Sequence, residues 1–223
     1  MNGQKTVPKG KIFFRKNCNN QTYFCNQIHM LGSTARGFTL IEMLVVIAMV
    51  AVLSALAAPS VRDFMVRSAM SSAAGEFQAS VLRARNEAAN KNICTTMCLS
   101  TTTNADAPSC DTKGENDWQK GWIIFLNLDC DSSLNSPKKS NDVFFVRQDG
   151  DPNILIQSQS SPAVRKISFN SRGYNALSNA TELDLIYQTS NNINTKKYGI
   201  NICLDALGRT RLIPGNNSCS NYK

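Results

Sequence analysis

One uninterrupted apolar segment constrains this chain more than any other feature. From Phe38 to Ala58 there are 21 residues with a single charge, that of Glu42, and Arg36 lies just before them. At about 1.5 Å of rise per residue, a helix of this length spans the roughly 30 Å hydrocarbon layer of a bilayer. A carboxylate at the centre of such a helix costs about 2.5–3.5 kcal/mol, and less near an interface. The segment is therefore expected to cross a membrane, with a positive group, most simply from another chain, compensating Glu42.

The residues around this charge resemble a known processing site. The segment 37–42 reads Gly-Phe-Thr-Leu-Ile-Glu and is similar to the class III signal of type IV pilins and of type II secretion pseudopilins, and Pro59 also fits the pilin helix. The resemblance implies that a dedicated prepilin peptidase cuts after Gly37 and that Phe38 becomes an N-methylated N-terminus. It also implies that Glu42 pairs with the N-terminal amine of a neighbouring subunit during assembly.

Two simpler interpretations of the apolar segment compete with this one. The first is an ordinary single-span anchor, in which Glu42 lies near the interface. The second is a general secretory signal peptide, because Ala55-Leu56-Ala57 has the small-x-small form of its cleavage site. The apolar run exceeds the 7–15 residues usual for such a peptide, contains a carboxylate and follows a very long leader, so the pilin interpretation is favoured.

The segment before the apolar run is basic. Residues 1–37 hold six of the 24 basic residues and none of the 16 acidic ones, so their removal lowers the net charge from +8 to +2. Any anionic partner is then expected to meet a local patch, not the global field. The positive flank places the N-terminus in the cytoplasm of a bacterial inner membrane and the C-terminal part in the periplasm. A start at Met30 would give a leader of the usual pilin length; a genuinely long leader is the alternative.

Six cysteines follow the apolar segment: Cys94, Cys98, Cys110, Cys130, Cys203 and Cys219. An even number beyond an outward-facing anchor indicates disulfides formed in an oxidising periplasm. Six cysteines allow fifteen pairings, and the sequence does not choose among them. We favour Cys203–Cys219, then Cys98–Cys110, which would close a polar loop, and by elimination Cys94–Cys130. The alternative is a zinc site formed by the first four cysteines.

Beyond Pro59, small and apolar residues recur at spacings of three and four, which predicts that the helix continues through 59–91 with one buried stripe. The expected stripe comprises Val61, Phe64, Met65, Ser68, Ala69, Ser72, Ala73, Phe77, Ser80, Val81, Ala84 and Ala88. From there to residue 223, strand patterns separated by polar turns predict an antiparallel meander. The expected strands are Ile93–Ser100, Gly121–Asp129, Val143–Gln148, Ile154–Gln157, Ala163–Asn170, Glu182–Gln188, Tyr198–Leu204 and Arg209–Ile213. Exposed loops are expected at Ser132–Asn141 and Asn194–Tyr198. The fold class is therefore α+β.

Three downstream segments narrow the resemblance to the FimT/GspH group of minor pilins and pseudopilins. They are Trp118–Phe125, Ile167–Gly173 and Cys203–Arg211. The resemblance implies a pilin fold in which the long N-terminal helix packs on two antiparallel β-sheets.

The sequence offers no catalytic set. The chain's only histidine, His29, lies in the leader, and no phosphate-binding glycine loop is present. Asp129 and Asp131 are interpreted as turn residues, and a calcium site formed by them with Asp142 does not have the spacing of a known loop. We therefore expect a non-enzymatic chain with no cofactor and no metal.

The segment Gly208-Arg209-Thr210-Arg211 is the most informative surface element. On a strand, Arg209 and Arg211 would project from one face about 6.5–7 Å apart, with Thr210 and Leu212 directed to the core. That separation matches about two nucleotide rises, so both guanidiniums can contact neighbouring phosphates. In FimT proteins of naturally transformable bacteria, a matching Gly-Arg-x-Arg motif is linked to binding of incoming DNA. Weaker candidates are Arg172, Lys196, Lys197 and Lys223.

The simpler interpretation is that these arginines solvate an exposed face or pair with Asp205. We expect a minor pilin of a type IV pilus that joins other pilin subunits, reaches the cell surface and contacts DNA without sequence specificity in natural transformation. The alternative is a purely structural or priming subunit, or a GspH-like minor pseudopilin of a type II secretion system.

Overall fold

The computed structural model describes residues 37–176, 181–188 and 194–222, and the side chains of all of these except 194–196, 221 and 222. Helix α1, Leu40–Lys91, contains Pro59 and ends where the sequence predicts. Within the described ranges it is the one helix long and apolar enough to cross a membrane. At its start, Thr39 Oγ1 accepts a hydrogen bond of 3.2 Å from the Glu42 N–H, as an N-cap residue does.

All eight expected strands are present, with different ends. They are β1 (Cys94–Leu99), β2 (Trp122–Asn127), β3 (Val143–Arg147), β4 (Ile154–Ser158), β5 (Lys166–Phe169), β6 (Thr181–Gln188), β7 (Asn194–Leu204) and β8 (Thr210–Pro214). The predicted loop Asn194–Tyr198 is wrong, because β7 already pairs with β6 through Thr195 and Tyr187. Its first residues are all polar, so no apolar alternation marks them as a strand.

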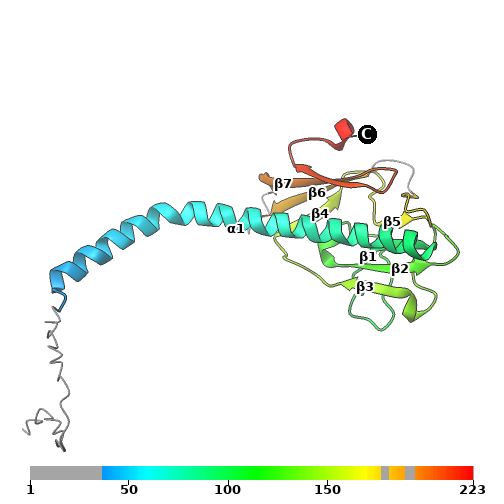
Figure 1. The fold of residues 1–223 in the computed structure, drawn as a ribbon, viewed down its shortest axis with the longest axis horizontal. Helices are drawn as coiled ribbons and strands as arrows, with labels where there is room; N and C mark the ends of the chain where they lie inside the picture. The colour runs from blue at the N-terminus through cyan, green and yellow to red at the C-terminus, as the bar shows by residue number, and fades with distance from the viewer. Residues whose placement is uncertain (1–36, 177–180, 189–193, 223) are drawn as a thin grey trace, which may run out of the picture. The chain divides into compact units, whose positions relative to one another are not determined.

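The strands form two four-stranded antiparallel sheets and not one meander (Figure 1). The orders are β3-β2-β1-β5 and β4-β6-β7-β8. The predicted meander holds for β1-β2-β3 and for β6-β7-β8, whereas β5 returns to pair with β1 and β4 joins the other sheet. The α+β class, with a long helix packed on antiparallel sheets, is confirmed.

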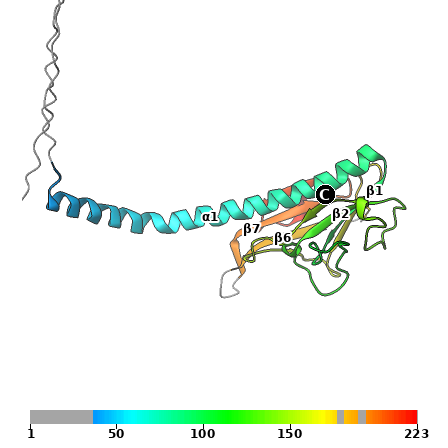
Figure 2. The ribbon, with the colours of Figure 1, turned by 90° about the horizontal axis from the view of Figure 1, so that it is seen from below.

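The C-terminal half of α1 packs on one side of the two sheets (Figure 2). Its buried stripe begins at Val66 and ends at Ala88. The expected stripe is correct at each of its positions from Ala73 onward, but it left out Val66, Met70 and Ala74, which are also buried. It is wrong at Val61, Phe64, Met65, Ser68 and Ser72, which are exposed. The sheets bury the helix only from Val66 onward, on the face that also carries Met70.

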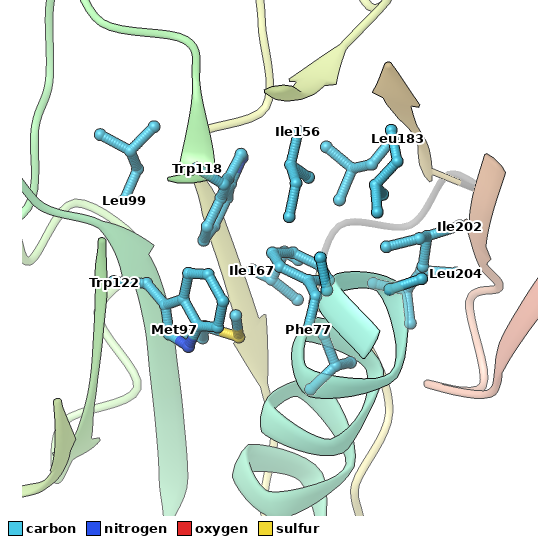
Figure 3. Close-up of a cluster of buried hydrophobic side chains, with 14 of the residues drawn as sticks. Phe77, Met97, Leu99, Trp118, Trp122, Ile156, Ile167, Leu183, Ile202 and Leu204 are labelled. Atoms are coloured by element: carbon cyan, nitrogen blue, oxygen red, sulfur yellow. The ribbon is translucent and has the colours of Figure 1, made fainter. Parts of the chain in front are cut away.

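One apolar core joins the helix to both sheets. Phe77 from α1 lies between two buried indoles, with ring centroids 5.2 Å from Trp118 and 5.3 Å from Trp122. Side chains of both sheets converge on it, among them Met97 and Ile202 (Figure 3). Edge-on aromatic pairs of this kind add about 0.5–1.5 kcal/mol each to the gain from burial.

Three disulfides close the described part of the chain, and they are the three pairs favoured from the sequence. They join Cys94 to Cys130, Cys98 to Cys110 and Cys203 to Cys219. The zinc alternative is wrong, because none of the four clustered cysteines retains a thiolate for a metal.

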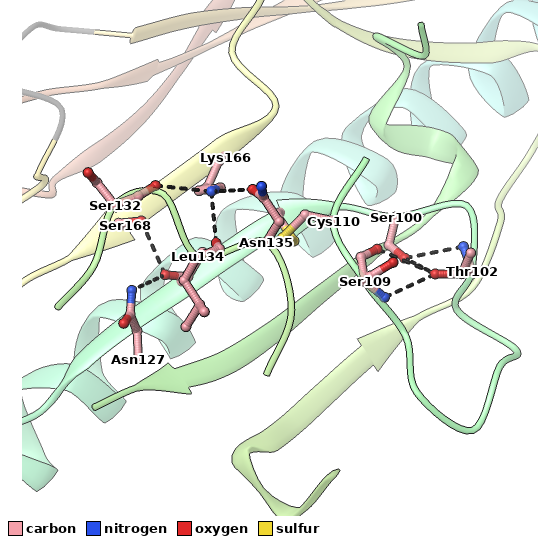
Figure 4. Close-up of a disulfide and its surroundings, with 12 residues drawn as sticks. Ser100, Thr102, Ser109, Cys110, Asn127, Ser132, Leu134, Asn135, Lys166 and Ser168 are labelled. Carbon is pink, nitrogen blue, oxygen red and sulfur yellow. Dashed lines mark hydrogen bonds between the residues drawn. A yellow bond between two sulfur atoms is a disulfide. The ribbon is translucent and has the colours of Figure 1, made fainter. Parts of the chain in front are cut away.

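A lysine supports the loop beside the Cys98–Cys110 bond. Lys166 Nζ donates to the carbonyl oxygens of Ser132 and Leu134 and to Asn135 Oδ1 (Figure 4). Partial burial lowers the pKa of Lys166. In the described ranges no group of three acidic, histidine or cysteine side chains is placed to hold a metal ion.

Candidate nucleic-acid interface

A tight hairpin loop connects β7 to β8. The Gly208 N–H donates to the Asp205 carbonyl, and the Asp205 N–H donates to the Arg209 carbonyl, each at 3.0 Å. Gly208 has φ +75°, which a residue without a Cβ adopts at no steric cost. The Asp205 carboxylate accepts from the Arg209 N–H at 2.7 Å and so closes the loop. This is a type I turn followed by a left-handed residue, a common three-residue hairpin connection.

A second turn, residues 170–175, follows β5 and lies against this hairpin loop. The Asn175 N–H donates to the Ala206 carbonyl at 3.1 Å. The two loops come very close at Gly173 and Gly208. A Cβ built on Gly208 would lie only 2.6 Å from the Gly173 carbonyl oxygen. We call residues 170–175 and 205–209 the loop pair. The loop pair joins the edge strand β5 of the first sheet to the β7–β8 connection of the second sheet.

The loop pair brings together three of the arginines predicted to contact DNA. Arg172 and Arg209 are exposed within it, and Arg211 is exposed on β8, opposite Cys203 of β7. The faces of β8 are as expected. Thr210 accepts hydrogen bonds from Gln78 of α1, and Leu212 packs against the core.

One of these arginines is already engaged by a carboxylate. Arg209 Nε donates to Asp205 Oδ2 at 2.6 Å, although its side chain is 68% exposed. Partial burial acts to raise the pKa of Asp205, but the hydrogen bonds from Arg209 outweigh it and hold that pKa below its usual value. The simpler interpretation from the sequence, an ion pair with Asp205, is therefore what the structure shows for Arg209. An arriving phosphate has to compete with this carboxylate.

The structure does not bring Lys197 to this site. Lys197 forms an ion pair of 2.5 Å with Asp63 of α1, and Tyr198 Oη donates to the same carboxylate. The hydrogen bond from Lys197, followed by that from Tyr198, lowers the pKa of Asp63. Seven residues separate Lys197 from Leu204 along β7, about 23 Å of strand. The Lys196 side chain and Lys223 lie outside the described residues.

Sequence reasoning missed Arg85. Its Nε donates to the Gly173 carbonyl at 3.0 Å, and its aliphatic carbons lie beside both glycines of the loop pair. Arg85 thus holds the loop pair from the side of α1 and adds positive charge there. Its place off the apolar stripe of α1 was visible in the sequence, but its partners are more than 80 residues away and no local pattern identifies them.

The residues of the processing motif lie at the start of the described chain. Phe38 is 79% exposed, and Glu42 is exposed in the first turn of α1. No cation of the described residues lies within ion-pair distance of the Glu42 carboxylate. Its expected partner is therefore not supplied by this part of the chain.

Two family models match the chain. Residues 73–208 match the model described as type II transport protein GspH, and residues 32–58 match the prokaryotic N-terminal methylation motif. The first match ends at Gly208, so Arg209 and Arg211 lie just beyond it.

Individual proteins show more limited likeness. Fimbrial protein EcpC of Eikenella corrodens is 48% identical over 44 residues, which cover 20% of this chain and 29% of that protein. The crystal structure of the type IV minor pilin FimU of Pseudomonas aeruginosa aligns over 69% of this chain and 95% of its own, at 19% identity and a TM-score of 0.46. A second crystal form of FimU aligns over 66% and 94%, at 18% identity and a TM-score of 0.42. Because the GspH model covers more than half of the residues and the methylation motif precedes it, the chain belongs to the GspH family of type IV pilin-like proteins.

Proposed function

We propose that this chain is a minor pilin that binds extracellular DNA for uptake, through phosphate contacts from the loop pair and β8. Membership of the GspH family supports the coarser part of this proposal. This part is that the chain is a subunit that interacts with other pilin-like subunits, in a type IV pilus or as a minor pseudopilin. The finer assignment, capture of DNA in natural transformation, is carried by one observation. Three arginines are exposed together at the loop pair and its adjoining strand, although Arg172 is distant in sequence from Arg209 and Arg211.

The contacts favour phosphate recognition over base reading. Guanidinium groups bind phosphate oxygens by paired hydrogen bonds, and such contacts carry no sequence information. The structure around them is firmly held: Asp205 closes the hairpin, Arg85 holds Gly173 and Gln78 holds Thr210. Two or three phosphate contacts imply weak binding whose affinity falls with salt, with a log–log slope of about −2 for two contacts.

The decisive experiment compares two double variants of the mature chain in detergent, by fluorescence anisotropy with a labelled duplex. Arg209→Gln/Arg211→Gln should lower affinity at least about tenfold and flatten the salt dependence by nearly two units, because two phosphate contacts are lost. The control, Lys113→Gln/Lys120→Gln, removes the same charge beside the Leu99–Trp122 end of the β1–β2 pair, away from the loop pair. Equal affinities of the two variants, or no binding by the wild type at low salt, would remove the DNA assignment.

A second candidate is a structural or priming subunit without DNA contact, including a pseudopilin of a type II secretion system. The Arg209–Asp205 ion pair favours it, since that guanidinium already has a partner. Failure of the DNA experiment would leave this function.

The proposal also covers how the chain is cleaved, modified and inserted in the membrane. We infer cleavage after Gly37 by a prepilin peptidase, methylation of Phe38, insertion in the inner membrane with the sheets in the periplasm, and later transfer to the pilus. Mass spectrometry of the mature chain should find N-methyl-Phe38 as the first residue. An N-terminus at Ala58 would instead show a general signal peptide.

A further inference from the structure

Two exposed apolar side chains accompany the arginines of the loop pair. In the described residues that follow α1, four large apolar side chains are strongly exposed: Leu128, Val146, Tyr174 and Leu207. Tyr174 is 44% exposed and Leu207 46% exposed, and both belong to the loop pair. An aromatic and an aliphatic side chain left in solvent beside exposed guanidiniums form a mixed apolar and cationic surface, which neither core packing nor solvation requires.

The two loops present the same chemistry in opposite order. One reads Arg172-Gly173-Tyr174 and the other Leu207-Gly208-Arg209. Both glycines have positive φ, 76° and 75°, and they meet at the closest contact of the loops. Each loop therefore carries one guanidinium and one apolar group on the two sides of a shared glycine contact. The backbone hydrogen bond from Asn175 to Ala206 joins the chain neighbours of Tyr174 and Leu207, so it holds the backbones of these two segments together.

This surface is pre-organised. Asn170 Oδ1 accepts from the N–H groups of both Arg172 and Tyr174 at 3.0 Å, and Arg85 holds the carbonyl of the glycine between them. A ligand that binds here does not have to order either loop. Less binding free energy is then lost to conformational entropy.

We propose that the loop pair is a binding site for single-stranded DNA, in which a nucleobase stacks on Tyr174 and packs beside Leu207 while the arginines hold the flanking phosphates. This inference rests on the proposed DNA function and adds the form of DNA. Every base has a π-face, so stacking on an aromatic ring is tolerant of sequence and suits capture of arbitrary DNA. In a duplex those faces are buried between neighbouring base pairs and only the phosphates remain available to this site. Single-stranded segments and frayed ends offer both groups at once.

The test uses the full-length mature chain in detergent and three fluorescein-labelled probes: a thymidine 20-mer, the same strand with abasic sites, and a 20-base-pair duplex. The wild type should bind the thymidine strand tighter than the abasic strand and the duplex. Tyr174→Ala should lose about 5- to 100-fold in affinity for the thymidine strand and little for the other two probes. Tyr174→Phe keeps the ring and should keep the preference. Val146→Ala, which trims an exposed apolar side chain on β3, should change nothing, and circular dichroism should confirm that each variant is folded.

The outcomes separate the two claims. If the wild type binds the thymidine and abasic strands equally, or if Tyr174→Ala binds the thymidine strand as the wild type does, the stacking site is overturned. If duplex binding then still depends on Arg209 and Arg211, the proposed DNA function survives that result. If none of the three probes binds at low salt, the DNA function falls and the stacking site with it.

Discussion

At the scale of single residues, Asp205 has two opposed effects. Its carboxylate shapes the hairpin by accepting from the Arg209 N–H, and it also neutralises the Arg209 guanidinium. The first effect needs only an oxygen acceptor, whereas the second needs a negative charge. An amide at this position retains the first effect and removes the second.

Asp205→Asn should therefore raise DNA affinity about threefold to tenfold. It removes a like charge beside the phosphate and releases Arg209, and an exposed charge pair is worth up to about 1 kcal/mol. The slope of the salt dependence should change by less than about one unit, because Arg209 contacts a phosphate in both forms. Anisotropy titrations at several salt concentrations measure both. Asp149→Asn, which removes an exposed carboxylate beside the loop at Gly150, should leave affinity within about twofold, and an equal gain in both variants would contradict the role of Asp205.

The same ion pair predicts how binding responds to pH. Hydrogen bonds from Arg209 hold the pKa of Asp205 below its usual value, so its charge is lost only as pH falls through that lowered pKa, in the acid range. The chain has no histidine after Gly37. DNA affinity should therefore stay constant between pH 5 and 8, in the wild type and in Asp205→Asn.

Much of the site could be predicted at this scale, because Gly208, Arg209 and Arg211 stand together in the sequence. Arg172 also required no structure to name, but its contact with the hairpin did. Neither Arg85 nor Tyr174 carries a local pattern that marks a site. Arg85 acquires significance only from the fold, since its partner Gly173 lies on another element. Tyr174 acquires it because its turn contacts the hairpin loop through Asn175 and Ala206.

At the scale of elements, the meeting of Gly173 and Gly208 decides whether the two loops form one surface. Gly208→Ala should destabilise the protein by more than the strain of its positive φ, because the added methyl group would lie 2.6 Å from the Gly173 carbonyl and 3.0 Å from the Phe169 ring. Gly114 provides a matched control, since its φ is +86° and no atom lies within 4 Å of an added Cβ.

We expect Gly114→Ala to cost about 1–2 kcal/mol, the strain of a left-handed residue with a side chain. Gly208→Ala should cost clearly more and should also weaken DNA binding. Urea unfolding of both variants measures the difference, with anisotropy as the functional readout. Equal losses of stability in Gly208→Ala and Gly114→Ala would contradict a stabilising contact between the two loops.

The elements themselves were largely predictable. All eight strands and the end of α1 follow from residue periodicity and turn residues. The partners of β4 and β5 did not follow, because a strand pattern specifies a buried face and not the neighbouring strand. The start of β7 was missed for a different reason: its polar residues become a strand only by pairing with β6.

At the scale of the whole molecule, Glu42 is the residue through which we expect this chain to pair with another subunit. The described part of the chain gives its carboxylate no cation, and a charge in hydrocarbon requires compensation. Glu42→Val should therefore enter the membrane as well as the wild type does, or better, but fail to enter filaments. Immunoblots of sheared filaments and of membrane fractions measure the two steps. Ile41→Val, the control, should behave as the wild type, and normal filament incorporation of Glu42→Val would refute the pairing.

The contacts that hold the loop pair also determine how mechanical tension would pass through the subunit. Arg85 donates a hydrogen bond to the Gly173 carbonyl and Gln78 donates one to Thr210. A load applied at the loop pair or at β8 therefore reaches α1 through these two side chains. The β7–β8 and β5–β1 ladders carry such a load in parallel with these side chains. A polymer pulled from outside would therefore load α1 directly as well as through the sheets, and α1 is the helix that is expected to hold the subunit among its neighbours.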